Sequence, residues 1–131
     1  MLFRSREIYR AAEGNIQQVA LTPTRLVVSG VLGGPSTLRT KDLRTGRVRD
    51  VAIPPVSAVS QLVAAGEDVL FVQERYVEPP AWLRLAREGS VQSTPLAGRP
   101  VPAFGDVLVS RGEAVSKDGT HVPLKIGRAH V

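Results

Sequence analysis

No long stretch of this sequence keeps the 3.6-residue apolar period of an amphipathic helix. Short β-branched runs and alternating apolar residues dominate instead, and 12 Gly and 10 Pro among the 131 residues interrupt them. Such a pattern is typical of short strands joined by turns. The chain is long enough for one ordinary domain with one hydrophobic core. We therefore expect an all-β fold made of many short strands.

The first group of predicted strands ends at a Pro-Pro pair. Its apolar pattern predicts four strands, which are Ile16–Thr22, Leu26–Val31, Ser36–Leu43 and Arg47–Ile53. Leu38 and Leu43 are the expected apolar anchors of the third strand. The segment Asp42–Gly46 is expected to form a hairpin turn in which the glycine takes a positive φ.

A second group of four predicted strands follows that pair. Its members are Ala58–Ala64, Val69–Tyr76, Trp82–Ala86 and Val91–Leu96. Each group spans about 40 residues, and a repeat of about that length with four strands is typical of a β-propeller blade. A β-sandwich shows a similar strand spacing and stays the alternative on this pattern alone.

The number of repeats predicts an incomplete propeller. A closed propeller needs about four to eight blades, whereas this chain supplies about two. Blades without neighbours leave open strand edges and one-sided cores. We therefore expect an isolated chain of marginal stability that tends to associate.

The remainder of the chain predicts one more hairpin. A Pro-bearing connection at 97–103 is followed by a strand over Val107–Val115. Asp118 and Gly119 then predict a tight turn that leads into a strand over His121–Leu124.

One DNA sequence, translated in opposite orientations, can encode both ends of the chain. The codons ATC GGA AGA GCA CAC GTC encode Ile126–Val131, and this DNA resembles a common short-read sequencing adapter. Its reverse complement contains GTG CTC TTC CGA TCT, which encodes Met1–Ser5 when GTG is the start codon. We therefore expect residues 1–5 and 125–131 to be adapter-derived artefacts, so that the natural part is an internal piece of a longer protein.

The composition excludes several classes of site. The sequence has no Cys, so disulfides, Cys-ligated zinc and a Cys nucleophile are excluded, and it has only two His. No apolar run approaches the roughly 18 residues of a membrane span. The net charge is +5, but without Arg4, Lys125 and Arg128 only 14 basic residues face 12 acidic ones. We expect no metal, no cofactor, no membrane and no nucleic-acid partner.

A serine hydrolase of the α/β type needs the motif Gly-x-Ser-x-Gly at a strand-to-helix turn. Ser29 precedes Gly30 and Ser90 follows Gly89, but neither serine has both glycines in place. The only histidine outside the suspected adapter ends is His121, which we expect on an exposed strand. No catalytic, substrate-binding or metal-ligating residue is therefore predicted in this chain.

Three other clusters are better explained by structure than by chemistry. The glycines of 30–34 lack a following helix or lysine and predict a turn, not a phosphate loop. Glu67 and Asp68 are adjacent, so their side chains point to opposite faces of a strand and make a poor acid-base pair. Trp82 and Tyr76 are expected in the core or between blades.

Five basic residues gather on one predicted hairpin, at Arg39, Lys41, Arg44, Arg47 and Arg49. A basic patch of this kind raises the alternative of a nucleic-acid binder. The chain lacks basic and aromatic residues in alternation, which would form a stacking surface. We therefore expect a solvated outer strand.

One string is distinctive, the segment Ser116–Leu124 with the sequence SKDGTHVPL. It resembles the Ser-Lys-Asp-Gly-Thr-x-Val-Pro hairpin through which members of the prolyl oligopeptidase family pass from the last propeller blade into the catalytic domain. Leu38–Gly46 is similar to a blade segment that ends in Asp-Leu-x-Thr-Gly. Asp68–Trp82 is similar to the family's last blade, in which an aromatic-rich strand runs into a Pro-containing loop.

The resemblance implies the end of a seven-bladed-type propeller, over residues 6–115, and the start of an α/β-hydrolase domain, over 116–124. It implies a parent serine peptidase that cleaves short peptides, often after proline, with the propeller covering the catalytic cavity. The nucleophile, acid and base of the family lie downstream of this segment, so the fragment itself is expected to be inactive. A non-catalytic propeller or sandwich that binds a partner is the alternative. The compartment, cytoplasmic or periplasmic, stays open.

Overall fold

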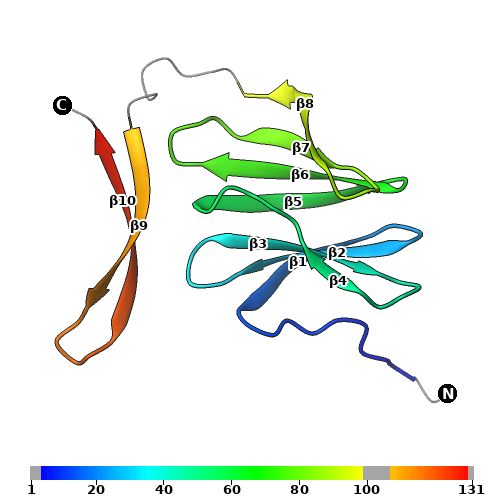
Figure 1. Ribbon diagram of the computed structural model, residues 1–131, viewed down its shortest axis with the longest axis horizontal. Helices are drawn as coiled ribbons and strands as arrows, with labels where there is room; N and C mark the ends of the chain where they lie inside the picture. Colours follow the sequence, from blue (N-terminus) through cyan, green and yellow to red (C-terminus); the bar gives the residue numbers. More distant parts are fainter. Residues whose placement is uncertain (1–3, 99–106, 130–131) are drawn as a thin grey trace.

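The computed structural model describes residues 4–98 and 107–129, and these residues form ten strands and no helix (Figure 1). The first eight strands are β1 (Asn15–Leu21), β2 (Arg25–Val31), β3 (Ser36–Asp42), β4 (Val48–Asp50), β5 (Ser57–Ala65), β6 (Asp68–Arg75), β7 (Ala81–Leu85) and β8 (Val91–Ala97). The last two are β9 (Val107–Val115) and β10 (His121–Ala129). The all-β prediction is confirmed.

The strands form two four-stranded antiparallel sheets and one separate hairpin. The sheet orders are β1-β2-β3-β4 and β5-β6-β7-β8, so each strand pairs with its neighbour in sequence. β9 and β10 pair only with each other among the described strands, and they stand beside one end of the two sheets (Figure 1). In the part of the chain that the structure describes, no helix is long and apolar enough to cross a membrane.

The hairpin turns follow the residues that predicted them. Gly46, Gly89 and Gly119 have φ values of 74°, 102° and 84°, a region that only glycine enters without strain. The amide of Gly46 donates to the carbonyl of Asp42 at 2.8 Å. The Asp42 carboxylate also accepts hydrogen bonds from the amides of Arg44 and Thr45, at 2.9 and 2.7 Å. The turn is thus closed by both backbone and side chain.

The core lies between the two sheets, which pack face to face. Val27 and Leu38 of the first sheet and Val69, Phe71 and Leu85 of the second are almost completely buried there. In β6, Val69 and Phe71 flank the less buried Leu70, as the period-two pattern predicts, whereas β2 is buried on both faces over Arg25–Ser29. One apolar layer therefore joins the sheets.

The edge strand β5 directs two amides toward the first sheet instead of toward a strand. The amide of Val59 donates to the Ser36 hydroxyl at 2.9 Å, and the amide of Leu62 donates to the Gln18 side-chain carbonyl at 2.8 Å. A β-bulge at Gln61, which has a φ of 57°, precedes the second contact. These contacts satisfy backbone donors that an edge strand would otherwise leave unpaired.

Several details differ from the sequence-based expectations. The fourth strand covers only Val48–Asp50 instead of reaching Ile53, although the Val51 amide still donates to the Leu38 carbonyl. Leu43 was an expected anchor but is 42% exposed, because it lies in the β3–β4 turn. Tyr76 is 65% exposed, because the strand ends before it.

Two further expectations concern the ends of the described segments. β10 continues past Leu124 to Ala129 because β9 offers it partners as far as Val107. The adapter origin predicted for residues 125–131 stays a prediction. Most of the predicted connection 97–103, residues 1–3 and His130 lie outside the described residues.

The Asp42 turn predicts a pH dependence of stability. Hydrogen bonds from the Thr45 amide and hydroxyl, more than the Arg44 amide, lower the pKa of Asp42 below its usual 3.8. A lowered folded-state pKa contributes stability that is present above pH 3.8 and is lost as the pH falls through the folded value. We expect Asp42→Asn to lower the melting temperature at neutral pH and to have little effect in strong acid. Circular dichroism across that pH range measures this; an equal difference at every pH would contradict it.

Candidate functional site

The side chains that could carry catalysis do not converge. The His121 Nδ1 lies 3.0 Å from a carboxylate oxygen of Glu113 across the β9–β10 hairpin, and both side chains are exposed. Ser29 is 1% exposed in the first sheet, and its hydroxyl has no hydrogen-bond partner among the described residues. The Ser90 hydroxyl donates to the Glu88 carboxylate in the β7–β8 turn. The structure therefore assembles no nucleophile and base from these residues.

The glycine-rich segment between β2 and β3 forms a turn, as predicted. Gly33 and Gly34 have φ values of 58° and 114°. The Gly33 carbonyl accepts a hydrogen bond from the Arg111 guanidinium of β9 at 2.9 Å, and a Cβ at Gly33 would lie only 2.6 Å from that guanidinium. This turn therefore serves as the contact with the hairpin.

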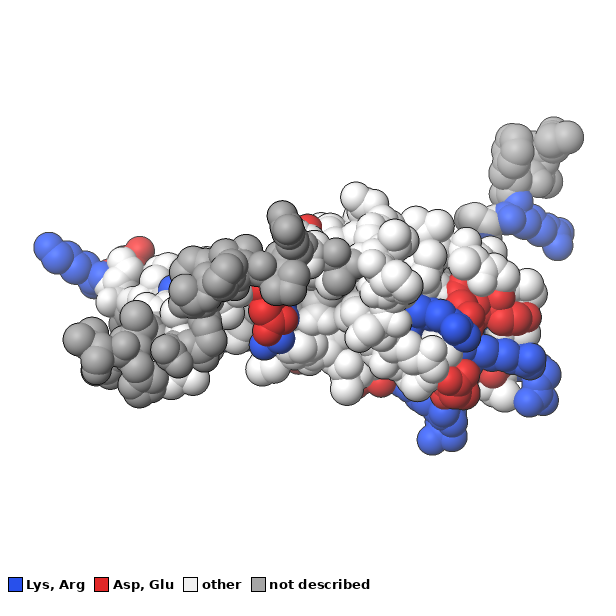
Figure 2. Space-filling model, turned by 90° about the horizontal axis from the view of Figure 1, so that it is seen from above, with Lys and Arg blue, Asp and Glu red and all other residues white. Residues whose placement is uncertain are grey.

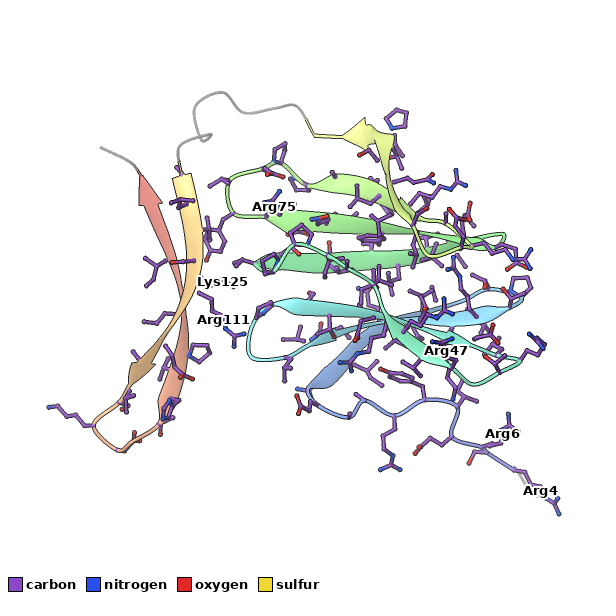
Figure 3. All side chains as sticks on the ribbon, viewed as in Figure 1. Arg4, Arg6, Arg47, Arg75, Arg111 and Lys125 are labelled. Atoms are coloured by element: carbon purple, nitrogen blue, oxygen red, sulfur yellow. The ribbon has the colours of Figure 1, made fainter. Side chains whose placement is uncertain are left out.

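A second contact joins the hairpin to the sheets. The Lys125 ammonium lies 5.5 Å from the centre of the Tyr76 ring, within the range of a cation-π interaction. Figure 3 shows Arg111 and Lys125 extending from the hairpin toward the sheets, on the side where Arg75 ends β6. The hairpin therefore marks one end of the sheets, which we call the hairpin end.

The opposite end of the sheets holds a buried arginine. Arg25 begins β2 and is only 7% exposed. Its guanidinium donates to three backbone carbonyls of the second sheet, those of Glu67 at 2.9 Å, Leu85 at 3.1 Å and Arg87 at 3.2 Å. Burial lowers the pKa of Arg25, which the nearby carboxylates of Asp68, Glu67 and Glu88 offset in part. Arg25 thus ties the two sheets together through backbone atoms.

A groove of about 850 Å³ opens above Arg25, between the turns of the two sheets. Residues of the β1–β2 turn, of β3 and β4, of the β3–β4 turn and of the β7–β8 turn line it. Its charged lining consists of Arg25, Arg44, Arg47, Arg49, Arg87, Asp42, Asp50 and Glu88. Three of the five basic residues that the sequence places on the β3–β4 hairpin, namely Arg44, Arg47 and Arg49, line the groove. Arg39 and Lys41 are not part of its lining.

Within the residues that the structure describes, no group of three or more His, Asp or Glu residues could hold a metal ion.

Solved structures of known peptidases share this fold. A prolyl endopeptidase structure matches 92% of this chain with a TM-score of 0.75 and 22% sequence identity. Oligopeptidase B from Leishmania major matches 91% with a TM-score of 0.71 and 18% identity. Oligopeptidase B from Trypanosoma brucei, solved with covalently bound antipain, matches 92% with a TM-score of 0.72 and 15% identity.

The match is nearly complete for this chain and partial for the peptidases, since the chain spans only 18–19% of their length. The sequence matches no protein-family model, and the comparison with curated proteins finds no match. The resemblance to the prolyl oligopeptidase family is thus confirmed at the level of the fold. Two antiparallel four-stranded sheets, similar to those of the peptidases' propeller domain, make up most of the chain.

Sequence reasoning missed Arg25, because the second strand was predicted to start at Leu26. An arginine directly before a continuous apolar run was the available signal, since a strand that is buried on both faces also buries its first residue. The groove could not be predicted, because it needs the β7–β8 turn of the other sheet.

The Arg25 contacts predict a large effect of removing the guanidinium. In Arg25→Met, the buried carbonyl of Leu85 and the part-buried carbonyls of Glu67 and Arg87 lose their donor, which should lower the free energy of unfolding by about 2–3 kcal/mol. Arg84→Met is the matched control, because Arg84 pairs with Asp68 at the surface and is 47% exposed. That variant should lose less than about 1 kcal/mol. Urea unfolding followed by circular dichroism compares them, and equal losses would refute the role assigned to Arg25.

Proposed function

We propose that this chain is the end of the β-propeller of a serine peptidase of the prolyl oligopeptidase family, joined to the first hairpin of its α/β-hydrolase domain. One observation carries the proposal. Two consecutive four-stranded sheets with the fold of these peptidases are followed by a hairpin whose turn is built from the Ser116–Leu124 motif. On this proposal residues 6–115 are the last blades and 116–124 begin the hydrolase domain.

Exposed apolar side chains on both sides of the two sheets support the proposal that further elements of the parent protein pack there. Val19 and Leu21 of β1 are 56% and 59% exposed. Leu96 of β8 is 62% exposed, and Leu108 of β9 is 63% exposed. Apolar residues gathered on sheet faces in this way are typical of surfaces that another element covers. Further blades would cover the sheet faces, and the hydrolase domain would cover the hairpin.

The proposed role of the propeller is to select substrates by size. A ring of blades around a narrow channel admits short peptides and excludes folded proteins. Reaction in the enclosed cavity then benefits from the exclusion of water, which strengthens the stabilisation of developing charge. The parent enzyme would use short peptides, with cleavage after proline as the expected preference. The nucleophile, acid and base would all come from the hydrolase domain, and residues 1–5 and 125–131 would be replaced by the parent's own sequence.

The proposal predicts activity only in the longer protein. When the reading frame is extended in both directions from its source DNA and expressed, we expect hydrolysis of a short fluorogenic peptide with proline before the leaving group. A folded protein that carries the same cleavage sequence in an exposed loop should be cut far more slowly. The 131-residue chain should cut neither substrate.

The control is the longer protein in which the serine of the Gly-x-Ser-x-Gly motif is replaced by alanine, and this variant should be inactive. Peptidase activity in the purified 131-residue chain would contradict the proposal, and so would a folded longer protein that hydrolyses no peptide.

A further inference from the structure

The groove above Arg25 has a charge arrangement that the proposed peptidase function does not use. It lies at the end of the sheets away from the hairpin, and Figure 2 shows Lys and Arg together with Asp and Glu at that end. Both walls come from the described sheets, the β3–β4 hairpin on one side and the β7–β8 turn on the other. Both walls of the groove are therefore present in the described residues.

The acidic side chains of the groove already have partners. The Asp42 carboxylate accepts from two backbone amides of its own turn. Asp50 is paired at 2.7 Å with Arg39, the residue directly opposite it in the β3–β4 pair. The Glu88 carboxylate accepts from the Ser90 hydroxyl at 2.5 Å. All three carboxylates of the groove therefore already have a partner, and their negative charge is only in part available to the groove's arginines.

The basic side chains have few such partners. Among the described residues, no ion pair is formed by Arg44, Arg47, Arg49 or Arg87, and all four are exposed. A guanidinium is a planar fork that binds carboxylates through two parallel hydrogen bonds. Four exposed guanidinium groups around one concavity make a surface that attracts anions.

The floor of the groove adds an independent observation. Arg25 lines it with a side chain that is more than nine-tenths buried. Its guanidinium binds carbonyl oxygens instead of a carboxylate, and its Nε has no hydrogen-bond partner among the described residues. Because the guanidinium hydrogen-bonds no carboxylate, and Asp68, Glu67 and Glu88 offset its burial only in part, the space above it favours negative charge.

We propose that this groove binds an acidic peptide segment, with carboxylates on the arginines at its rim. The lining favours a peptide over a nucleic acid for two reasons. It contains no aromatic side chain on which a base could stack. It also mixes three carboxylates with the arginines, and a peptide backbone offers N–H donors to those carboxylates, whereas a phosphate backbone is repelled by them.

The test uses the 131-residue chain itself and a fluorescein-labelled oligoglutamate peptide, with binding followed by fluorescence anisotropy. We expect saturable binding that weakens as salt is added, because exposed charges are screened. An oligoglutamine peptide of the same length should not bind. Single-stranded DNA should bind more weakly than oligoglutamate.

The matched variants are Arg47→Glu in the groove and Lys117→Glu in the β9–β10 turn, which make the same change in net charge at opposite ends of the molecule. Arg47→Glu should weaken oligoglutamate binding by about tenfold or more, whereas Lys117→Glu should change it less than about twofold. Circular dichroism establishes that both variants are folded.

Three results would overturn the inference: no binding of oligoglutamate, tighter binding of DNA than of oligoglutamate, or equal losses in the two variants. None of these depends on peptidase activity. Failure of the groove proposal is therefore distinguishable from failure of the proposed function.

Discussion

The arrangement of the two sheets depends on a cation that is buried between them. Arg25 is fixed at the start of β2 and donates to three carbonyls of the second sheet. Burying a guanidinium is costly unless its donors are satisfied, so the second sheet must present those carbonyls at one distance and angle. The apolar layer around Phe71 and Leu85 is not directional, whereas the Arg25 contacts are. Together they fix how far apart the turns of the sheets lie, and hence the shape of the groove.

The molecule consequently has two unlike ends. At the hairpin end, Arg111 holds the Gly33 turn, and apolar residues of β9 and β10 remain exposed. A further domain on that side would cover them, in keeping with the proposed passage into a hydrolase domain. At the other end, the turns bring arginines around a concavity. On the two proposals, a further domain would cover one end and an acidic peptide would bind at the other.

Much of the fold could be predicted from the sequence, because strands and hairpin turns depend on patterns of residues that are close together in the chain. Period-two alternation and short β-branched runs located the ten described strands to within a few residues, except that β4 is shorter and β10 longer than expected. Asp42 and Gly46 identified their hairpin turn because the turn needs both a carboxylate cap and a positive φ. The burial expected for Leu43 was wrong, since burial depends on which element lies opposite, and Tyr76, expected in the core or between blades, is not in the core. Arg25 and the groove arise between sheets whose contacts are distant in sequence, and no local pattern encodes them.

The proposed function requires that the catalytic domain of a peptidase follows the Ser116–Leu124 hairpin. Sequencing the source DNA beyond the codon for Leu124 shows whether it does. We expect an open frame of about 200–300 residues that contains Gly-x-Ser-x-Gly, then an aspartate, then a histidine, the order found in α/β-hydrolases. A stop codon within a few codons of Leu124, or a long frame without that order, would contradict it.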